Sequence, residues 1–258
     1  MKTRGLVLGV LCLGVVLSLG IAARAQAPEN QLIWVSEFVV EPARSAEFEA
    51  VVKDWLAFYV EIKYPWSFTV YRTEDFHYYL LSPIKDMAGL EEMMKTDMEL
   101  AAKGGPKYEA LLKRSRGSYS FMNNDLVVLR YDLSYLPEPP RVSTQDARFI
   151  CWDYYYGLPG MEKESEQIAK DWQALYKSKN IPDGFLNYML IMGPDMPLTV
   201  GARWGKDAAD FNAADEFLRK TAGDAYTALA DKTMALCRKY ERRLGYLLEA
   251  LSYWPQTK

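Results

Sequence analysis

The triplet Lys53-Asp54-Trp55 occurs twice in this chain of 258 residues, and its second occurrence, Lys170-Asp171-Trp172, lies 117 positions later. At the same shift, segment 42–71 matches segment 159–188 at eleven of thirty positions without a gap. Random pairing would give about two identities, because each residue type makes up about 5% of an average protein. The chain is therefore a tandem duplication, and each copy is one structural unit.

The spacing of apolar residues predicts the same order of elements in both copies. In the first copy we expect strand, helix, strand, strand, interrupted helix and strand, at 31–40, 43–63, 67–72, 76–82, 86–112 and 125–135. In the second copy the same elements are expected at 148–156, 161–179, 185–192, 198–204, 207 to about 240, and about 244 to 253. Each copy is thus a β-α-β-β-α-β unit, and the last helix of the second copy is expected to be one long helix.

The register between the copies marks their boundaries. Both copies end in similar segments, Leu133-Ser134-Tyr135-Leu136-Pro137 and Leu251-Ser252-Tyr253-Trp254-Pro255, which we call the closing segments. The first repeat is expected over 31–136, a proline-rich linker over 137–146 and the second repeat over 147–255. Lys85-Asp86 matches Lys206-Asp207 at a shift of 121, so the hairpin of the second copy carries four extra residues.

The start of the chain has the layout of an export signal. Lys2 and Arg4 precede an apolar run, and Ala23-Arg24-Ala25 supplies the small residues of a cleavage site. Residues 1–25 are therefore predicted to be a signal peptide of a secreted or periplasmic protein, with an uncleaved membrane anchor as the alternative. Cys151 and Cys237 follow this segment, and we expect two free thiols more than a disulfide, because a core of this size does not need one.

Composition and charge limit the classes of binding partner that we expect for this protein. The formal charge is −3, the pI is about 5.5, and 14% of the residues are aromatic. We find no run of Lys or Arg with interleaved exposed aromatic residues, so nucleic-acid binding is not expected. After the signal segment no stretch is long and apolar enough to span a membrane, so no membrane partner is expected after cleavage. A small apolar or aromatic molecule is the expected partner, and the protein is expected to be a monomer or a weak homo-oligomer.

The order of elements predicts an α+β fold. A β-α-β-β-α-β unit forms a ferredoxin-like antiparallel sheet with both helices on one face. The strands here are apolar on both faces, so the two sheets are expected to face each other as a single-chain, pseudo-dimeric α/β barrel. The tryptophan of each Lys-Asp-Trp triplet falls on the apolar stripe of its helix. We interpret it as a core residue that anchors the helix to its sheet.

The duplication and element order resemble those of the dimeric α/β-barrel superfamily. This group includes antibiotic-biosynthesis-type monooxygenases, EthD-like and NIPSNAP-like proteins, and relatives of chlorite dismutase. The resemblance covers essentially all of the chain after residue 25. It implies that a ligand site lies between a sheet and its helices or inside the barrel, and it implies no particular activity.

Few residues offer catalytic chemistry. His77 is the only histidine, so a zinc site is not expected, and no metal ligand is proposed. Some members of the resembled superfamily bind haem, and His77 is then the candidate axial ligand. The alternative is a hairpin-edge histidine that meets solvent. Hydrolase, nucleotide-binding and zinc-protease motifs do not occur in the sequence.

Strand alternation suggests a second set of candidates. Trp34, Ser36 and Phe38 point one way, and their counterparts are Cys151, Asp153 and Tyr155. We expect this set to project into the barrel, because the opposite set is more uniformly apolar and suits the helices. Asp153 among aromatic residues could act as a base, and its alternative is a structural carboxylate that hydrogen-bonds a tyrosine or an arginine.

Further ligand-binding candidates are aromatic and basic. Tyr79 and Tyr155 could line a pocket for a flat molecule, and Arg72 and Arg203 could hold an anionic group. Barrel filling and ion pairs at the sheet rim are their structural alternatives. Three hypotheses remain open: a small-molecule-binding barrel without catalysis, an enzyme of the cofactor-independent monooxygenase or haem type, and a structural scaffold.

Overall fold

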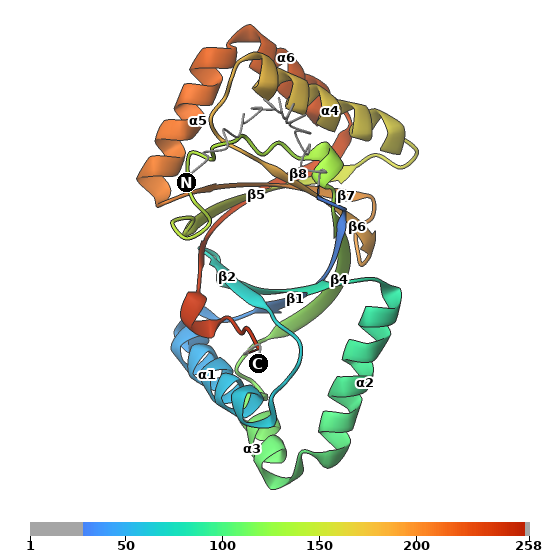
Figure 1. Ribbon diagram of the computed structural model, residues 1–258, viewed down its shortest axis with the longest axis vertical. Helices are drawn as coiled ribbons and strands as arrows, with labels where there is room; N and C mark the ends of the chain where they lie inside the picture. The colour runs from blue at the N-terminus through green and yellow to red at the C-terminus, as the bar shows by residue number, and fades with distance from the viewer. Residues whose placement is uncertain (1–27, 256–258) are drawn as a thin grey trace, which may run out of the picture.

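The computed structural model describes residues 28–255 and folds them into one closed, antiparallel, eight-stranded barrel (Figure 1). The predicted signal peptide lies outside the described residues. The first copy comprises β1 Gln31–Val39, α1 Ser45–Ile62, β2 Thr69–Thr73, β3 His77–Ile84, α2 Met87–Lys103, α3 Gly105–Ser115 and β4 Phe121–Leu129. The second comprises β5 Phe149–Gly157, α4 Glu162–Ser178, β6 Leu186–Met192, β7 Leu198–Gly205, α5 Ala208–Ala222, α6 Asp224–Ala235 and β8 Cys237–Leu247.

The barrel consists of two four-stranded sheets joined edge to edge. The sheets have the strand orders β4-β1-β3-β2 and β8-β5-β7-β6, and β2 pairs with β8 while β4 pairs with β6. The helices α1–α3 cover one sheet and α4–α6 cover the other, at opposite ends of the long axis (Figure 1). The predicted α+β, pseudo-dimeric barrel is therefore confirmed. Within residues 28–255, no helix combines the length and apolar character needed to cross a membrane.

The second helical region of each copy is broken by glycine. In the first copy the break falls at Gly105, with a φ of 62°, and in the second copy at Gly223, with a φ of 53°. Positive φ values are costly for residues with a Cβ atom, so a continuous helix ends there. The prediction of one long helix to about residue 240 is wrong. The helix splits at Gly223 and α6 ends at Ala235, because residues 237–247 pair with β5 as β8.

The strand faces are the reverse of those expected. The lumen is filled by an apolar cluster that includes Val35, Tyr79, Trp152 and Tyr154. Trp34 packs beneath α2, and Phe38 contacts Phe48 of α1. Because Ser36 shares the parity of these two residues, and Asp153 shares that of their counterparts, the expectation that both project into the barrel is wrong. Both lie on the helix-covered face.

The repeated tryptophan joins two helices rather than a helix and its sheet. Trp55 Nε1 donates a hydrogen bond to Ser115 Oγ at 2.9 Å, and Trp172 Nε1 donates to Thr233 Oγ1 at 3.0 Å. These bonds connect α1 to α3 and α4 to α6. The sequence pattern predicts a core residue that anchors its helix to the sheet. In the structure each tryptophan is partly buried, and its hydrogen-bond partner is the helix that precedes the last strand of the copy.

The closing segments bind each copy to the other. Tyr135 exchanges two backbone hydrogen bonds with Phe185, at 2.9 and 2.8 Å, just before β6 begins. Tyr253 does the same with Phe68, just before β2, at 2.8 and 2.9 Å. Each closing segment therefore crosses to the opposite copy, and the two crossings are related by the pseudo-twofold symmetry of the barrel.

The serine of each closing segment completes this connection. Ser134 Oγ accepts the backbone N–H of Asn187 at 2.9 Å, and Ser252 Oγ accepts that of Val70 at 2.9 Å. Both serines are buried, and both also donate to the backbone carbonyl four residues earlier, that of Arg130 or Leu248. Each hydroxyl thus satisfies a strand N–H that would otherwise be buried without a partner.

We expect Ser134→Ala and Ser252→Ala each to lower the free energy of unfolding by about 1–2 kcal/mol, because a buried backbone N–H loses its acceptor. Denaturant unfolding at pH 7 measures the change. Ser178→Ala, at the exposed end of α4, is the control and should change stability by less than about 0.5 kcal/mol. Variants of the closing segments that unfold like the control would contradict this role.

Candidate functional site

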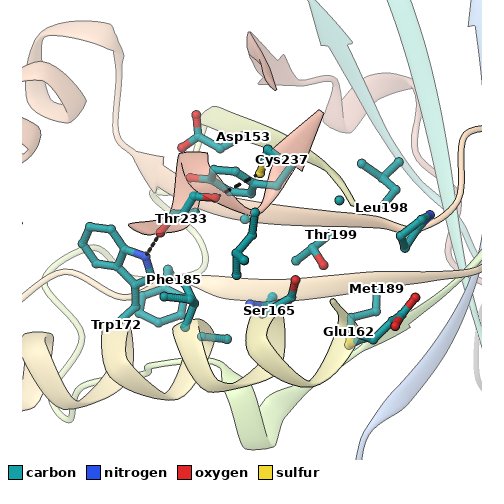
Figure 2. A pocket seen from close by; sticks show the side chains of 18 of the residues that line it. Asp153, Glu162, Ser165, Trp172, Phe185, Met189, Leu198, Thr199, Thr233 and Cys237 are labelled. Atoms are coloured by element: carbon teal, nitrogen blue, oxygen red, sulfur yellow. Dashed lines mark hydrogen bonds between the residues drawn. The ribbon is translucent and has the colours of Figure 1, made fainter. Parts of the chain in front are cut away.

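A cavity of about 410 Å³ lies in the second copy, between the sheet face of β5–β8 and helices α4, α5 and α6. This is one of the two locations that the superfamily resemblance implies. Figure 2 shows Ser165 and Trp172 of α4 on one wall, with Thr199 of β7 on the sheet side. The lining is mainly apolar, with Ile168, Leu190, Leu198, Leu218 and Phe185 among its members. Its size and character are typical of sites for small organic molecules.

The corresponding space in the first copy is filled by aromatic side chains. Phe38, Phe48, Tyr78 and Tyr119 form a continuous cluster there, with ring centroids 4.7–6.4 Å apart. Phe48, Tyr78 and Phe38 belong to or pack against the largest core cluster of that copy. The first copy therefore has a solid core where the second has a cavity.

Smaller residues open the cavity in the second copy. The strand registers pair Tyr78 with Thr199 and Phe38 with Tyr155 as structural equivalents. The helix register places Ser165 where the first copy has Phe48. Two of these three exchanges remove an aromatic ring, and so the volume of the first copy's core becomes free space in the second.

The sheet floor shows the same divergence. One row of cross-strand neighbours runs from Asn187 through Gly201 and Asp153 to Arg242. The equivalent row in the first copy is Val70, Leu80, Ser36 and Asn124. The cavity floor is therefore polar at both ends and has no side chain at Gly201, whereas the equivalent residue of the first copy is Leu80.

Asp153 is the centre of an ion-pair network at one end of the cavity. Its side chain accepts hydrogen bonds from Tyr240 Oη at 2.6 Å and from Arg242 Nε and Nη2 at 2.6 and 3.1 Å. Arg203 Nη2 lies 3.7 Å from the carboxylate, and its Nη1 donates to Asp215 at 2.6 Å. Asp153 is only 4% exposed. Its oxygens are occupied by cationic donors, which is the structural alternative considered for this residue, and this arrangement does not favour proton abstraction.

Tyr155 borders this network and faces the cavity. Burial, followed by the charge of Asp153, raises the pKa of its phenol well above the ordinary value. The phenol therefore stays protonated at neutral pH and is a hydrogen-bond donor for whatever occupies the cavity.

The two cysteines of residues 28–255, Cys151 and Cys237, are free thiols. Cys151 is fully buried under the ion-pair network, and burial raises its pKa to about 11. Cys237 lines the cavity, its Sγ lies 3.2 Å from the Thr233 carbonyl oxygen, and burial raises its pKa as well. Neither is a ready nucleophile, because the thiolate is the reactive form.

His77 lies on the opposite face of the barrel wall, in a polar cluster at one end of the lumen. Glu37 Oε1 lies 2.7 Å from His77 Nδ1 and accepts hydrogen bonds from Tyr79 Oη at 2.6 Å and Arg243 Nη1 at 2.8 Å. Arg243 also contacts Tyr79 Oη. Burial raises the pKa of Glu37, but these three hydrogen bonds outweigh it and lower the pKa to about 2. Arg243 comes from the second copy, so the cluster ties the two copies together.

The predicted site residues thus separate into three places. Asp153, Tyr155 and Arg203 line the cavity. His77 and Tyr79 belong to the lumen cluster. The others lie in the first copy on the helix-covered side: Trp34, Ser36, Phe38 and Arg72, the last beside Glu49 at 3.3 Å.

The sequence analysis missed the residues that create the cavity, namely Ser165, Asn187, Thr199 and Gly201. At the equivalent position of the first copy, each has a larger apolar or aromatic residue. The signal was therefore present in the alignment of the two copies, as a one-sided loss of side-chain volume.

The residues present do not fit a haem in the cavity. His77 is separated from the cavity by the sheet, and the Cys237 thiol has a raised pKa that disfavours a thiolate ligand. Among residues 28–255, no group of three or more His, Cys, Asp or Glu side chains could hold a metal ion.

The barrel and its helix-covered cavity define the class: the protein has the dimeric α/β-barrel fold, with both halves in one chain. The fold is similar to that of an anthrone oxidase-like protein, with a TM-score of 0.61 and 9% identity over 86% of this chain and 93% of that chain. It is also similar to proposed monooxygenases from Fusobacterium nucleatum and Lactobacillus acidophilus. Their TM-scores are 0.54 and 0.52 and their identities 11% and 7%, over 85% of this chain and 93% and 94% of theirs. No protein-family model and no curated protein sequence matches the chain.

We expect Glu37→Gln to lower the free energy of unfolding by about 2 kcal/mol at pH 7, because three donors lose their anionic acceptor in a partly exposed cluster. Glu37 has a pKa of about 2 when folded against an ordinary 4.5, so its contribution is present above pH 4.5 and is lost as the pH falls toward 2. Denaturant unfolding between pH 7 and pH 3 measures the difference. A gap between native and variant that widens on acidification would contradict the assignment.

Proposed function

We propose that the protein binds a small, largely apolar, ring-containing molecule in the cavity of the second copy. The observation that carries this proposal is the contrast between the copies. The space between the sheet and its helices is filled by aromatic rings in the first copy and is a cavity in the second. A cavity costs stability, because its lining loses packing contacts. A ligand that fills the cavity restores those contacts.

The lining supports this class of ligand. Trp172, Tyr176, Phe185 and Tyr155 offer aromatic faces, and aliphatic side chains cover much of the remainder. At about 30 Å³ for each water-sized group, 410 Å³ accommodates on the order of ten to fifteen non-hydrogen atoms. This corresponds to two or three fused rings.

Oxidation of such a molecule is the second candidate function, and the names of the similar structures favour it. An oxygen electrode distinguishes the two candidates. Anthrone added to the protein should raise oxygen uptake above the spontaneous rate if the cavity supports oxidation, and should leave it unchanged if the protein only binds. The predicted signal peptide leads us to propose further that either function is carried out in a secreted or periplasmic protein.

Filling the cavity with residues of the first copy should abolish binding. We expect Gly201→Leu and Ser165→Phe to weaken the binding of naphthalene, 2-naphthol and anthrone at least tenfold, because each side chain occupies the ligand's volume. A Cβ atom on Gly201 would lie 3.5 Å from Tyr155 Cε2, an ordinary contact, so the backbone tolerates the change. Quenching of tryptophan fluorescence, to which Trp172 in the cavity wall contributes, and thermal shift report binding.

Ala174→Phe is the matched control, because it adds a ring to an exposed position of α4. It should bind the three probes like the native protein. If none of the probes bound the native protein, or if Gly201→Leu bound them unchanged, the proposal would be overturned.

Haemin titration tests the haem branch of the enzymatic hypothesis. We expect no saturable Soret shift, because neither His77 nor Cys237 is available as an axial ligand in the cavity. A saturable shift that His77→Ala removes would contradict this expectation.

A further inference from the structure

One buried polar group in the cavity has no partner. Asn187 is 7% exposed and lines the cavity, and its Oδ1 is buried without a hydrogen-bond partner within residues 28–255. Its backbone groups are satisfied, since the N–H donates to Ser134 Oγ and the carbonyl accepts from Arg130 N. The side-chain Oδ1 is the atom left unpaired. Buried carbonyl groups without a partner are uncommon and destabilise a fold.

The first copy shows that this cost is not required by the fold. The equivalent position is Val70, which is fully buried in an apolar core cluster. The strand therefore accepts an apolar side chain at this position. An asparagine in its place has a cost in the unliganded protein that a ligand with a matching polar group offsets.

Asn187 borders the space that a ligand would fill, because it lines the cavity. Its cross-strand neighbour on β7 is Gly201, which has no side chain to cover it. The Tyr155 ring lies beyond Gly201, 3.5 Å from the position that a Cβ atom would occupy there. A flat ring that lies over Gly201 against Tyr155 brings its substituent to Asn187.

We propose that Asn187 is the polar recognition residue of the cavity, and that the ligand is an apolar ring system with a hydroxyl group that hydrogen-bonds the Asn187 amide. This inference rests on the proposed binding function, and it specifies the ligand class. The apolar walls bind the ring system, and Asn187 selects for the hydroxyl group.

The test compares two probes that differ in one group, 2-naphthol and 2-methylnaphthalene, in native protein and in Asn187→Val. Titration calorimetry gives the ratio of the two affinities in each protein. We expect this ratio, 2-naphthol over 2-methylnaphthalene, to fall about tenfold from native to variant, because only the hydroxyl probe loses a hydrogen bond to a buried partner. Asn187→Leu, closer in length to asparagine, should behave in the same way.

A readout without ligand checks the folding of the variants. Removing an unpaired buried amide should raise the Tm of the unliganded protein by about 2–4 °C. The reason is that the cost of the unpaired oxygen disappears, and the buried Val70 shows that the equivalent site accepts an apolar side chain. This rise also distinguishes Asn187 from an ordinary core polar residue, whose removal lowers Tm.

The outcomes separate this inference from the proposed function. If the native protein binds neither probe nor anthrone, the binding function itself fails. If it binds both probes and the ratio is the same in native protein, Asn187→Val and Asn187→Leu, the binding function stands and the role of Asn187 is overturned. Equal weakening of both probes in the two variants would also overturn it, because the residue would then only shape the cavity.

Discussion

The closure of the barrel depends on the hydrogen bonds that the closing segment of each copy makes to the second strand of the other copy. These strands are β2 and β6. The β2–β8 edge pairs over only three residue pairs, 71–73 with 245–247, and the closing segment extends this contact through Ser252 and Tyr253. Gly245 is needed at this edge, because a Cβ atom there would lie 2.5 Å from the Arg72 carbonyl oxygen. Without these contacts each four-stranded sheet would expose two edges and its inner apolar face. The serine and tyrosine that recur in the closing segments therefore reinforce the β2–β8 and β4–β6 pairings that join the two sheets.

Because both copies contribute to closing the barrel, the fold tolerates a loosely packed space between sheet and helices in one of them. The first copy contributes a dense aromatic core under α1, with Phe48 against Tyr78 at 4.7 Å between ring centroids. The second copy keeps its strand register and its helix-to-helix tryptophan bond, and it replaces the equivalent rings with Ser165 and Thr199. Dense packing and the cavity thus lie in different copies of one ancestral unit. The stability that the cavity costs is offset by the packed first copy and by the closing segments.

The duplication made most of the fold predictable from sequence, because a repeated β-α-β-β-α-β order has few ways to bury two apolar sheet faces. Which face of the sheet meets the helices was not predictable from alternation. Both faces of β1 are apolar, with Trp34 and Phe38 on one and Ile33 and Val35 on the other. The alternation of apolar and polar residues therefore does not indicate which face meets the helices. The break at Gly223 was missed because a single glycine interrupts a helix only where the tertiary structure requires a turn. The cavity was missed because apolar patterning records which residues are buried and not how much volume they fill.

The lumen cluster has a consequence for assembly. Glu37 of the first copy meets Arg243 of the second at 2.8 Å, and the residue of the first copy that is equivalent to Arg243 is Asp125. The charge of Glu37 already contributes to a raised pKa of Asp125, to about 6, after the larger effect of burial. If two first copies paired as a homodimer, each Glu37 would face a carboxylate of its partner in place of a guanidinium, twice over, inside a poorly solvated lumen. Self-pairing of the first copy is thus disfavoured electrostatically, because the second copy supplies the guanidinium that Glu37 faces.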